Sequence, residues 1–190
     1  IMHESAPSQD QQNALISLYQ TGQLPKAEEM CHDLLRAYPR SVILYNVLGA
    51  ALIGQGKQQQ ALDAFEKAIE LQPDSSVAYS NRGNVLKDLG RHEEALKSYD
   101  QAIELNPNYE EAHSNRGNAL KKLEQHDEAL RSFDRAIELQ PNYAEAYSNR
   151  GNALRDLGQL EEALRSYESA IELKPNFAEA YYNRGNALGD

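Results

Sequence analysis

Small and apolar residues recur along the chain at spacings of three and four, the period of an α-helix and not the period of two of a β-strand. In residues 76–109 the first such set is Tyr79, Gly83, Leu86 and Leu89. A second set begins at Ala95, after Gly90 has interrupted the pattern, and it stops before Pro107. Because proline disfavours helix in the residue before it, this segment predicts two helices joined by a short turn.

The same pattern returns every 34 residues. Prolines occur at Pro39, Pro73, Pro107, Pro141 and Pro175, and glycines at Gly49, Gly83, Gly117, Gly151 and Gly185. A fixed period of this length is typical of a stacked repeat protein. The sequence therefore predicts an all-α fold, an α-solenoid of five helix-turn-helix units at 8–41, 42–75, 76–109, 110–143 and 144–177, with a partial sixth at 178–190.

The start of the chain carries local signals for helix boundaries. Ser8 and Gln11 have the spacing of a capping box, so the first helix is expected to begin there. Residues 1–7 are expected to be disordered or foreign to the natural chain, since an isoleucine precedes the methionine. Pro25 fits the first turn of the next helix, where its missing N–H costs little.

Five glycines occur at the same repeat position inside the predicted first helices, although glycine costs about 1 kcal/mol relative to alanine in a helix. This cost suggests that a larger side chain would not fit there. We expect the partner helix to approach closely there. The column expected to face the glycines is Ala61, Ala95, Ala129 and Ala163. Replacing Gly117 with leucine is then expected to force the two helices apart.

These residues resemble the tetratricopeptide repeat family. The match comprises an aromatic or similar residue, the glycine and a leucine in the first helix, then two alanines and an aromatic residue in the second helix, and the final proline. It is weakest in residues 8–41, where Leu15 replaces the glycine and Cys31 the second aromatic residue. The column that the family often fills with leucine holds Arg82, Arg116, Arg150 and Arg184. We expect these arginine stems to pack while their charged heads reach water.

The resemblance implies a right-handed superhelix. In it the first helices line a concave inner wall and the second helices form the outside. Such arrays usually bind a peptide or protein in the groove and carry no chemistry of their own.

A polar stripe runs along the side of each first helix opposite the apolar set. It holds eight asparagines: Asn81, Asn84, Asn115, Asn118, Asn149, Asn152, Asn183 and Asn186. An amide both donates and accepts hydrogen bonds, so amides stacked repeat after repeat could bind the main chain of an extended ligand. This stripe is similar to the asparagine ladder in the repeat arrays of O-linked N-acetylglucosamine transferases. The alternative interpretation is that these asparagines are generic family residues that help neighbouring repeats to pack.

Two kinds of side chain flank the asparagine stripe. The serines are Ser80, Ser114 and Ser148, and the cations along one side are Lys121, Lys122 and Arg155. These cations leave room for a ligand with some acidic residues. The cations of a clamp for acidic chaperone tails are missing, since Val77, Glu111 and Ser114 stand in the clamp columns.

Charge narrows the range of partners. The chain has 19 lysines and arginines against 29 aspartates and glutamates, which gives a net charge of −10 and a pI near 5.0. Nucleic acid repels such a chain, so we expect no nucleic-acid partner. No apolar run approaches the roughly 20 residues that span a bilayer, so we expect no membrane insertion. The lack of a secretory segment favours the cytoplasm.

The sequence offers little support for catalysis, cofactors or metal binding. Cys31 lies in the core column of the aromatic residues, so we expect a buried, inert thiol. His92 and His126 lack cysteine or carboxylate partners at ligand spacing, so no metal site is expected. The sequence contains no phosphate-binding loop and no nucleophile motif, so neither an enzyme activity nor a cofactor is expected.

Three functions remain open. The first is a scaffold that binds an extended peptide or protein segment through the asparagine-lined wall. The second is the substrate-recruiting part of a larger bacterial enzyme, because the chain loosely resembles arrays that precede glycosyltransferase or sulfotransferase domains. The third is end-to-end self-association, since the partial sixth unit would leave Tyr181 and Leu188 uncovered.

Overall fold

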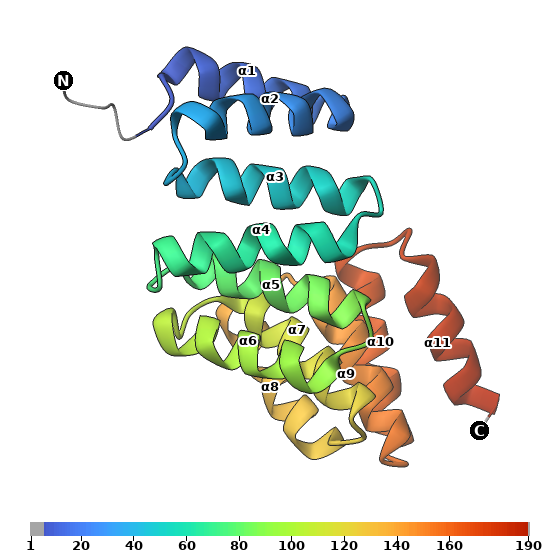
Figure 1. Ribbon diagram of the computed structural model, residues 1–190. Helices are drawn as coiled ribbons and strands as arrows, with labels where there is room; N and C mark the ends of the chain where they lie inside the picture. The colour runs from blue at the N-terminus through green and yellow to red at the C-terminus, as the bar shows by residue number, and fades with distance from the viewer. Residues whose placement is uncertain (1–5, 190) are drawn as a thin grey trace. The chain divides into compact units, whose positions relative to one another are not determined.

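The computed structural model describes residues 6–189, and every regular element in that range is an α-helix (Figure 1). The first helices of the repeats are α1 Gln9–Gln20, α3 Val42–Gly54, α5 Ser76–Asp88, α7 Glu110–Lys122, α9 Ala144–Asp156 and α11 Ala178–Gly189. The second helices are α2 Leu24–Ala37, α4 Gln58–Leu71, α6 His92–Leu105, α8 His126–Leu139 and α10 Leu160–Leu173. The predicted all-α solenoid of helix pairs with a 34-residue period is confirmed.

The chain divides into two compact units. Unit 1 runs to Arg91 and contains α1 to α5, and unit 2 begins at His92 and contains α6 to α11. Within unit 2, α8 packs between α7 and α9, and α10 packs between α9 and α11. The core around α8 is Leu120, Ala129, Phe133 and Ala153, and the core around α10 is Leu154, Ala163, Tyr167 and Ala187. The alanines of each core let neighbouring helices approach closely around one aromatic ring.

The turns inside the repeats use a left-handed residue. Four glycines of one column have φ between 73° and 76°: Gly22, Gly56, Gly90 and Gly158. The turn predicted at Gly90 is confirmed. At the same phase Glu124 adopts a φ of 60°, a conformation that costs a side-chain-bearing residue about 1 kcal/mol more than glycine.

The first helix begins as the sequence predicts. The Ser8 hydroxyl accepts a hydrogen bond from the Gln11 backbone N–H and the Gln11 side chain accepts one from Ser8 N–H, which closes the capping box. Pro25 lies in the first turn of α2. Pro7 is buried and its carbonyl accepts a hydrogen bond of 2.8 Å from Gln12 Nε2, so packing already starts there. Of the segment 1–7 that the sequence sets apart, residues 1–5 lie outside the described range.

The glycines of the first helices make room for aromatic rings. A Cβ atom on Gly117 would lie 2.6 Å from the ring of Phe133, and one on Gly151 would lie 2.6 Å from Tyr167. Gly49 faces Phe65 in the same way. The predicted steric demand of the partner helix is therefore confirmed at Gly49, Gly117 and Gly151, whereas a Cβ on Gly185 would meet nothing within 4 Å. The nearest neighbours of these three glycines are aromatic rings and not the predicted alanine column. The ring takes up the volume that a Cβ atom would need.

The arginine column also connects helices, while its side chains stay partly exposed, at 25% for Arg116 and 31% for Arg150. Arg116 donates from Nε to Asp100 Oδ1 at 2.6 Å and from Nη1 to Ser132 Oγ at 2.7 Å. Arg150 repeats this pattern with Asp134 at 2.6 Å and Ser166 at 2.8 Å. Each guanidinium thus links the second helix before it to the second helix after it, and we call this arrangement the arginine clip.

Two further expectations concern burial and membranes. Cys31 is fully buried, as predicted, and burial raises the pKa of its thiol to about 12. The thiol is therefore unreactive at neutral pH. Across residues 6–189, no helix combines the length and the apolar character needed to cross a bilayer.

Candidate functional site

The first helices of unit 2 form one continuous layer. α7 contacts α9, and α9 contacts α11, while the second helices α8 and α10 pack between them from the other side. Side chains that point away from the second helices therefore share one surface across α7, α9 and α11. We call this surface the inner wall. The polar residues of the stripe share one face of each first helix, because they are spaced by three and four, and this face lies on the inner wall.

The outer asparagine column lies on the inner wall with its side chains half-buried. It consists of Asn115 on α7, Asn149 on α9 and Asn183 on α11. Asn115 takes part in a polar interaction within the chain. Within residues 6–189 the amides of Asn149 and Asn183 form no hydrogen bond, so both their donors and acceptors remain available to a ligand.

The inner asparagine column consists of Asn118 on α7, Asn152 on α9 and Asn186 on α11, and its members differ in burial. Asn152 is 8% exposed, and its Oδ1 accepts a hydrogen bond of 2.8 Å from the buried hydroxyl of Tyr167. It supports packing within its own repeat, which corrects its assignment to the ligand ladder. Asn118 is half-buried, and Phe133, a ring without a hydroxyl, stands 15 residues after it, as Tyr167 does after Asn152. Asn186 is exposed. The packing interpretation of the asparagines therefore holds for Asn152.

Unit 1 carries the remaining predicted asparagines on one helix only. Asn81 and Asn84 are half-buried on α5, and Asn84 takes part in a polar interaction within the chain. At the equivalent positions 34 residues earlier, α3 has Val47 and Ala50. The asparagine pattern in unit 1 is therefore confined to α5.

The serines that the sequence places beside the stripe are core residues, which corrects that expectation. Ser114 is 2% exposed and Ser148 is 1% exposed. Ser114 shares a hydrogen bond with the hydroxyl of Tyr143, while burial raises the pKa of that phenol. The Oγ of Ser148 is buried without a hydrogen-bond partner, and Phe177, which has no hydroxyl, stands where Tyr143 stands in the repeat before.

The cations of the inner wall gather at one end of unit 2. Lys121 is half-buried, and burial lowers the pKa of its ammonium group although the carboxylates of Asp156 and Glu179 lie near enough to oppose the shift. Lys122 is exposed and Arg155 is half-buried. Arg155 Nη2 lies 4.0 Å from Asp156 Oδ1, so the cluster holds both signs of charge.

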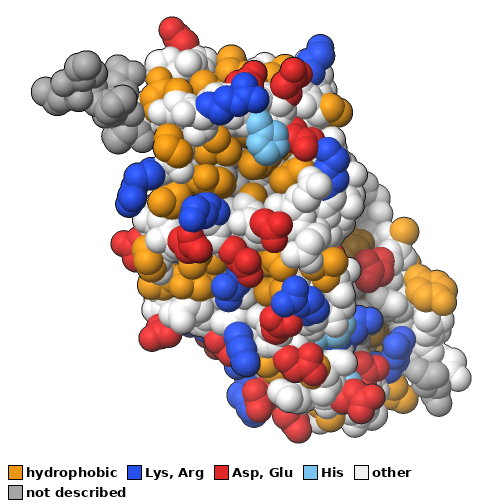
Figure 2. All heavy atoms as spheres, viewed as in Figure 1, with side chains coloured by type: hydrophobic (Ala, Val, Ile, Leu, Met, Phe, Trp, Pro, Cys, Tyr) orange, Lys and Arg blue, Asp and Glu red, His pale blue; other side chains and the backbone are white. Residues whose placement is uncertain are grey.

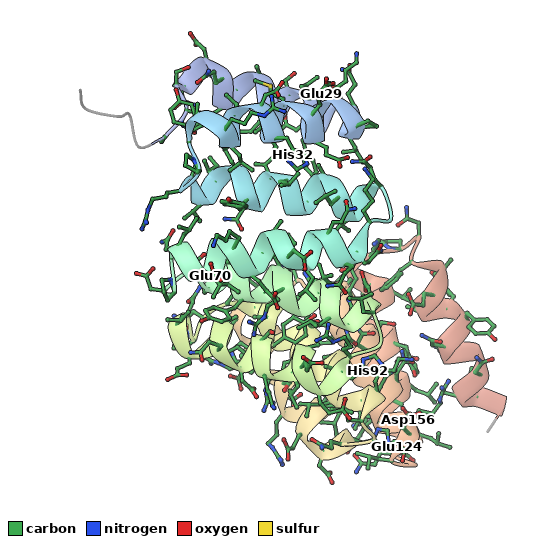
Figure 3. All side chains as sticks on the ribbon, viewed as in Figure 1. Glu29, His32, Glu70, His92, Glu124 and Asp156 are labelled. Carbon is green, nitrogen blue, oxygen red and sulfur yellow. The ribbon has the colours of Figure 1, made fainter. Side chains whose placement is uncertain are left out.

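Other acidic groups near the wall have basic neighbours. Asp156 Oδ2 lies 3.8 Å from His126 Nδ1, at the same end of unit 2 as Glu124 (Figure 3). Glu145 Oε1 accepts a hydrogen bond of 2.7 Å from Lys174 Nζ, and this ammonium holds the pKa of the Glu145 carboxyl below its usual range. In the part of the chain that the structure describes, no group of three or more His, Cys, Asp or Glu residues could hold a metal ion.

Sequence reasoning missed a cleft in unit 1. A cleft of about 550 Å³ opens between α2 and α4, and α3 forms its floor. Figure 2 shows hydrophobic side chains gathered over this part of unit 1. The sequence signal that could have found it is the break in the arginine column, since Leu48 stands where the next repeats have arginine.

Comparison with protein families identifies the repeats. Three models, described as a TPR repeat or tetratricopeptide repeat, match residues 83–124 and 151–190, residues 42–75 and 110–143, and residues 64–97 and 132–165. Together these matches extend without a gap over residues 42–190. No curated protein matches the chain.

Solved structures of YrrB, MamA and an RPAP3 repeat have a similar fold. YrrB, a TPR protein with an unusual peptide-binding site, has a TM-score of 0.76 and 26% identity over 94% of this chain and 92% of YrrB. MamA 41-end from Desulfovibrio magneticus RS-1 has a TM-score of 0.80 and 20% identity over 88% of this chain and 95% of the MamA 41-end chain. The first TPR of Spaghetti (RPAP3), bound to the HSP90 peptide SRMEEVD, has a TM-score of 0.59 and 30% identity over 60% of this chain and 90% of its own.

Proposed function

Because the chain belongs to the tetratricopeptide repeat family, we propose that it is a protein-interaction scaffold whose inner wall binds an extended peptide or protein segment. The observation that carries the proposal is the outer asparagine column of unit 2, where half-buried Asn149 and Asn183 keep unbonded amides on a continuous layer of helices. Peptide binding by YrrB and by the RPAP3 repeat is consistent with this role.

The spacing of the wall suits an extended main chain. Packed helices lie about 8–10 Å apart, and an extended peptide advances about 3.3 Å per residue. Each first helix therefore offers one amide to about every third residue of a ligand that crosses α7, α9 and α11. A side chain that reads only backbone N–H and C=O groups tolerates many ligand sequences, so we propose broad sequence tolerance with a preference added by the flanking charges.

The charges of the wall distinguish its ligand from an acidic chaperone tail. Exposed Glu111 lies on α7, where a clamp would need a cation, and it repels the carboxylates of such a tail. Half-buried Lys121 offers a cation nearer the other end of the same helix. We therefore propose that the ligand places one acidic residue near Lys121 and no acidic residue near Glu111.

A triple variant tests the proposal. The chain is exposed to a random-sequence peptide library, and the enriched peptides are titrated against the wild type and against N115A/N149A/N183A. We expect the triple variant to keep its far-UV circular dichroism and to lose at least about tenfold in affinity, from three hydrogen bonds of about 0.5–1.5 kcal/mol each. Exposed Asn142 lies outside the wall, so N142A is the matched control and should bind as the wild type. Equal affinity of the triple variant would refute the ladder.

End-to-end self-association is a second candidate function. It is favoured by the exposed apolar side chains of α11, with Tyr181 49%, Tyr182 70% and Leu188 62% exposed. A second copy of the chain is the proposed partner of this face. Light scattering should then give a mass that rises with concentration, and Y182E should abolish the rise; a monomer mass at all concentrations would refute it.

A further inference from the structure

The cleft of unit 1 occupies the place where unit 2 has an arginine clip. In unit 2, Arg116 is bonded to the residues 16 positions before and after it, Asp100 and Ser132. The residue of α3 equivalent to Arg116 is Leu48. Its neighbours at the same separations are His32 on α2 and Ala64 on α4, and all three residues line the cleft. Every member of the clip has therefore been replaced, and space is left between the second helices.

The lining of the cleft retains groups that suit a guanidinium. Tyr45 lines it and is the equivalent of Tyr79, whose ring lies 5.3 Å from the guanidinium carbon of Arg82. Leu48 and Leu52 form an apolar floor on which the methylene stem of an arginine can lie. The cleft therefore combines an aromatic ring with an apolar channel, the two surfaces that an arginine side chain uses.

Carboxylates enter the cleft from both walls. Asp63 on α4 is exposed, and among residues 6–189 it has no cationic partner. Glu28 on α2 accepts hydrogen bonds through Oε2 from Lys57 Nζ at 2.6 Å and Gln55 Nε2 at 2.8 Å, and the Lys57 ammonium lowers the pKa of this carboxyl. Glu28 is therefore ionised at neutral pH, and its Oε1 remains open to another donor.

The remaining charged groups do not compete for an arginine. Lys67 also lines the cleft, but its ammonium is paired with Glu70 on its own helix. His32 lies on the side of α2 that faces α3, and its ring lines the cleft (Figure 3). The unbalanced charge of the cleft is therefore the negative charge of Asp63.

We propose that this cleft is a second binding site of the chain, and that it takes an arginine side chain supplied by a protein partner. The stem lies on Leu48 and Leu52, the guanidinium stacks against Tyr45, and its N–H groups donate to Asp63 and Glu28. The partner thus supplies in trans the cation that Arg116 and Arg150 supply to unit 2 from within the chain. The site lies wholly in unit 1 and does not depend on the asparagines of the inner wall.

The test uses the full chain and N-acetylarginine amide as the probe. Methyl resonances of Leu48, Leu52 and Ala64 are followed by NMR as the probe is added. We expect saturable shifts with a dissociation constant on the order of 1 mM, typical of a ligand of about 15 heavy atoms. N-acetylcitrulline amide has nearly the same shape without the charge, and N-acetylnorleucine amide keeps only the apolar stem. Both should bind at least several-fold more weakly.

Two variants separate the proposal from simpler explanations. D63N should weaken arginine binding about two- to fivefold, the range for a partly exposed ion pair. H32D/L48R/A64S builds the clip of unit 2 into the cleft, should fold, and should abolish binding. N115A/N149A/N183A should bind the probe as the wild type, which keeps this site distinct from the inner wall.

Several results would overturn the assignment. Equal binding of the norleucine compound would leave a merely apolar cleft, and arginine binding that survives in H32D/L48R/A64S would place the probe elsewhere. Methyl shifts that depend on protein concentration without any probe would instead identify a second copy of the chain as the occupant.

Discussion

Adding one hydroxyl group should stabilise the end of unit 2. Ser148 is buried with no partner for its Oγ, and Phe177 stands 29 residues after it. One repeat earlier, Tyr143 stands 29 residues after Ser114, and their hydroxyls share a hydrogen bond. F177Y should therefore place a phenolic hydroxyl beside Ser148 and satisfy it, without a change in the apolar packing of the ring.

The magnitude follows from the cost of an unmade hydrogen bond. A net gain of about 0.5–1.5 kcal/mol is expected from one new hydrogen bond in a protein. The reverse variant Y143F should cost about 1–3 kcal/mol, because it leaves Ser114 buried and unsatisfied. S148A should be neutral or slightly stabilising in the wild type, whereas S114A should destabilise.

Urea titration followed by far-UV circular dichroism measures these differences, and amide hydrogen exchange in α9 and α11 places them. A gain of 1 kcal/mol corresponds to a rise in Tm of about 2–4 °C for a chain of this size. The cycle of Y143F with S114A should give a coupling of about 1 kcal/mol, and the cycle of F177Y with S148A should give a coupling of similar size, because the gain of F177Y requires the Ser148 hydroxyl. Unchanged or lower stability in F177Y, or a cost of S148A equal to that of S114A, would refute the reasoning.

Three more predictions follow from ring packing, backbone strain and burial. G151A should lower the free energy of unfolding by about 1–3 kcal/mol in urea titration, because its Cβ would overlap the Tyr167 ring. G185A, whose Cβ would have nothing within 4 Å, should gain up to about 1 kcal/mol. Equal effects of the two variants would contradict the ring contact. E124G should gain about 1 kcal/mol by relieving a positive φ, and a loss would argue against strain there. The Cys31 thiol, with its pKa near 12, should react with Ellman's reagent only at the rate of unfolding, and fast reaction at pH 8 would contradict its burial.

The fold could be predicted from the sequence because its signals are local and repeated. The turn at Gly90, the cap at Ser8 and the start of α2 near Pro25 depend on residues a few positions apart. The 34-residue period then predicts the boundaries of the remaining helices. Backbone conformation and hydrogen bonding within one helix decide these features, and both are determined by neighbours in sequence.

The candidate site could be predicted only in part. Helical periodicity predicts which side chains share a face of their own helix, so Asn115, Asn149 and Asn183 could be assigned to one column, and their role toward a ligand stays a prediction. Asn118 and Asn152 occupy one column as well, yet only Asn152 is bound to a hydroxyl, because Tyr167 rather than Phe133 lies on the helix packed against it. Residues at the same repeat position can therefore have different hydrogen bonds, because the neighbouring helix carries different residues opposite them.

The sequence by itself determined the helices, their order and the phase of each side chain around its own axis. Only the tertiary structure decided what each side chain meets across a helix interface. It turned the arginine heads into clips such as that of Arg116, placed aromatic rings over the glycines, and left a cleft beside Leu48. The physical reason is that contacts between helices depend on the size and polarity of residues far apart in the chain, which no local pattern records.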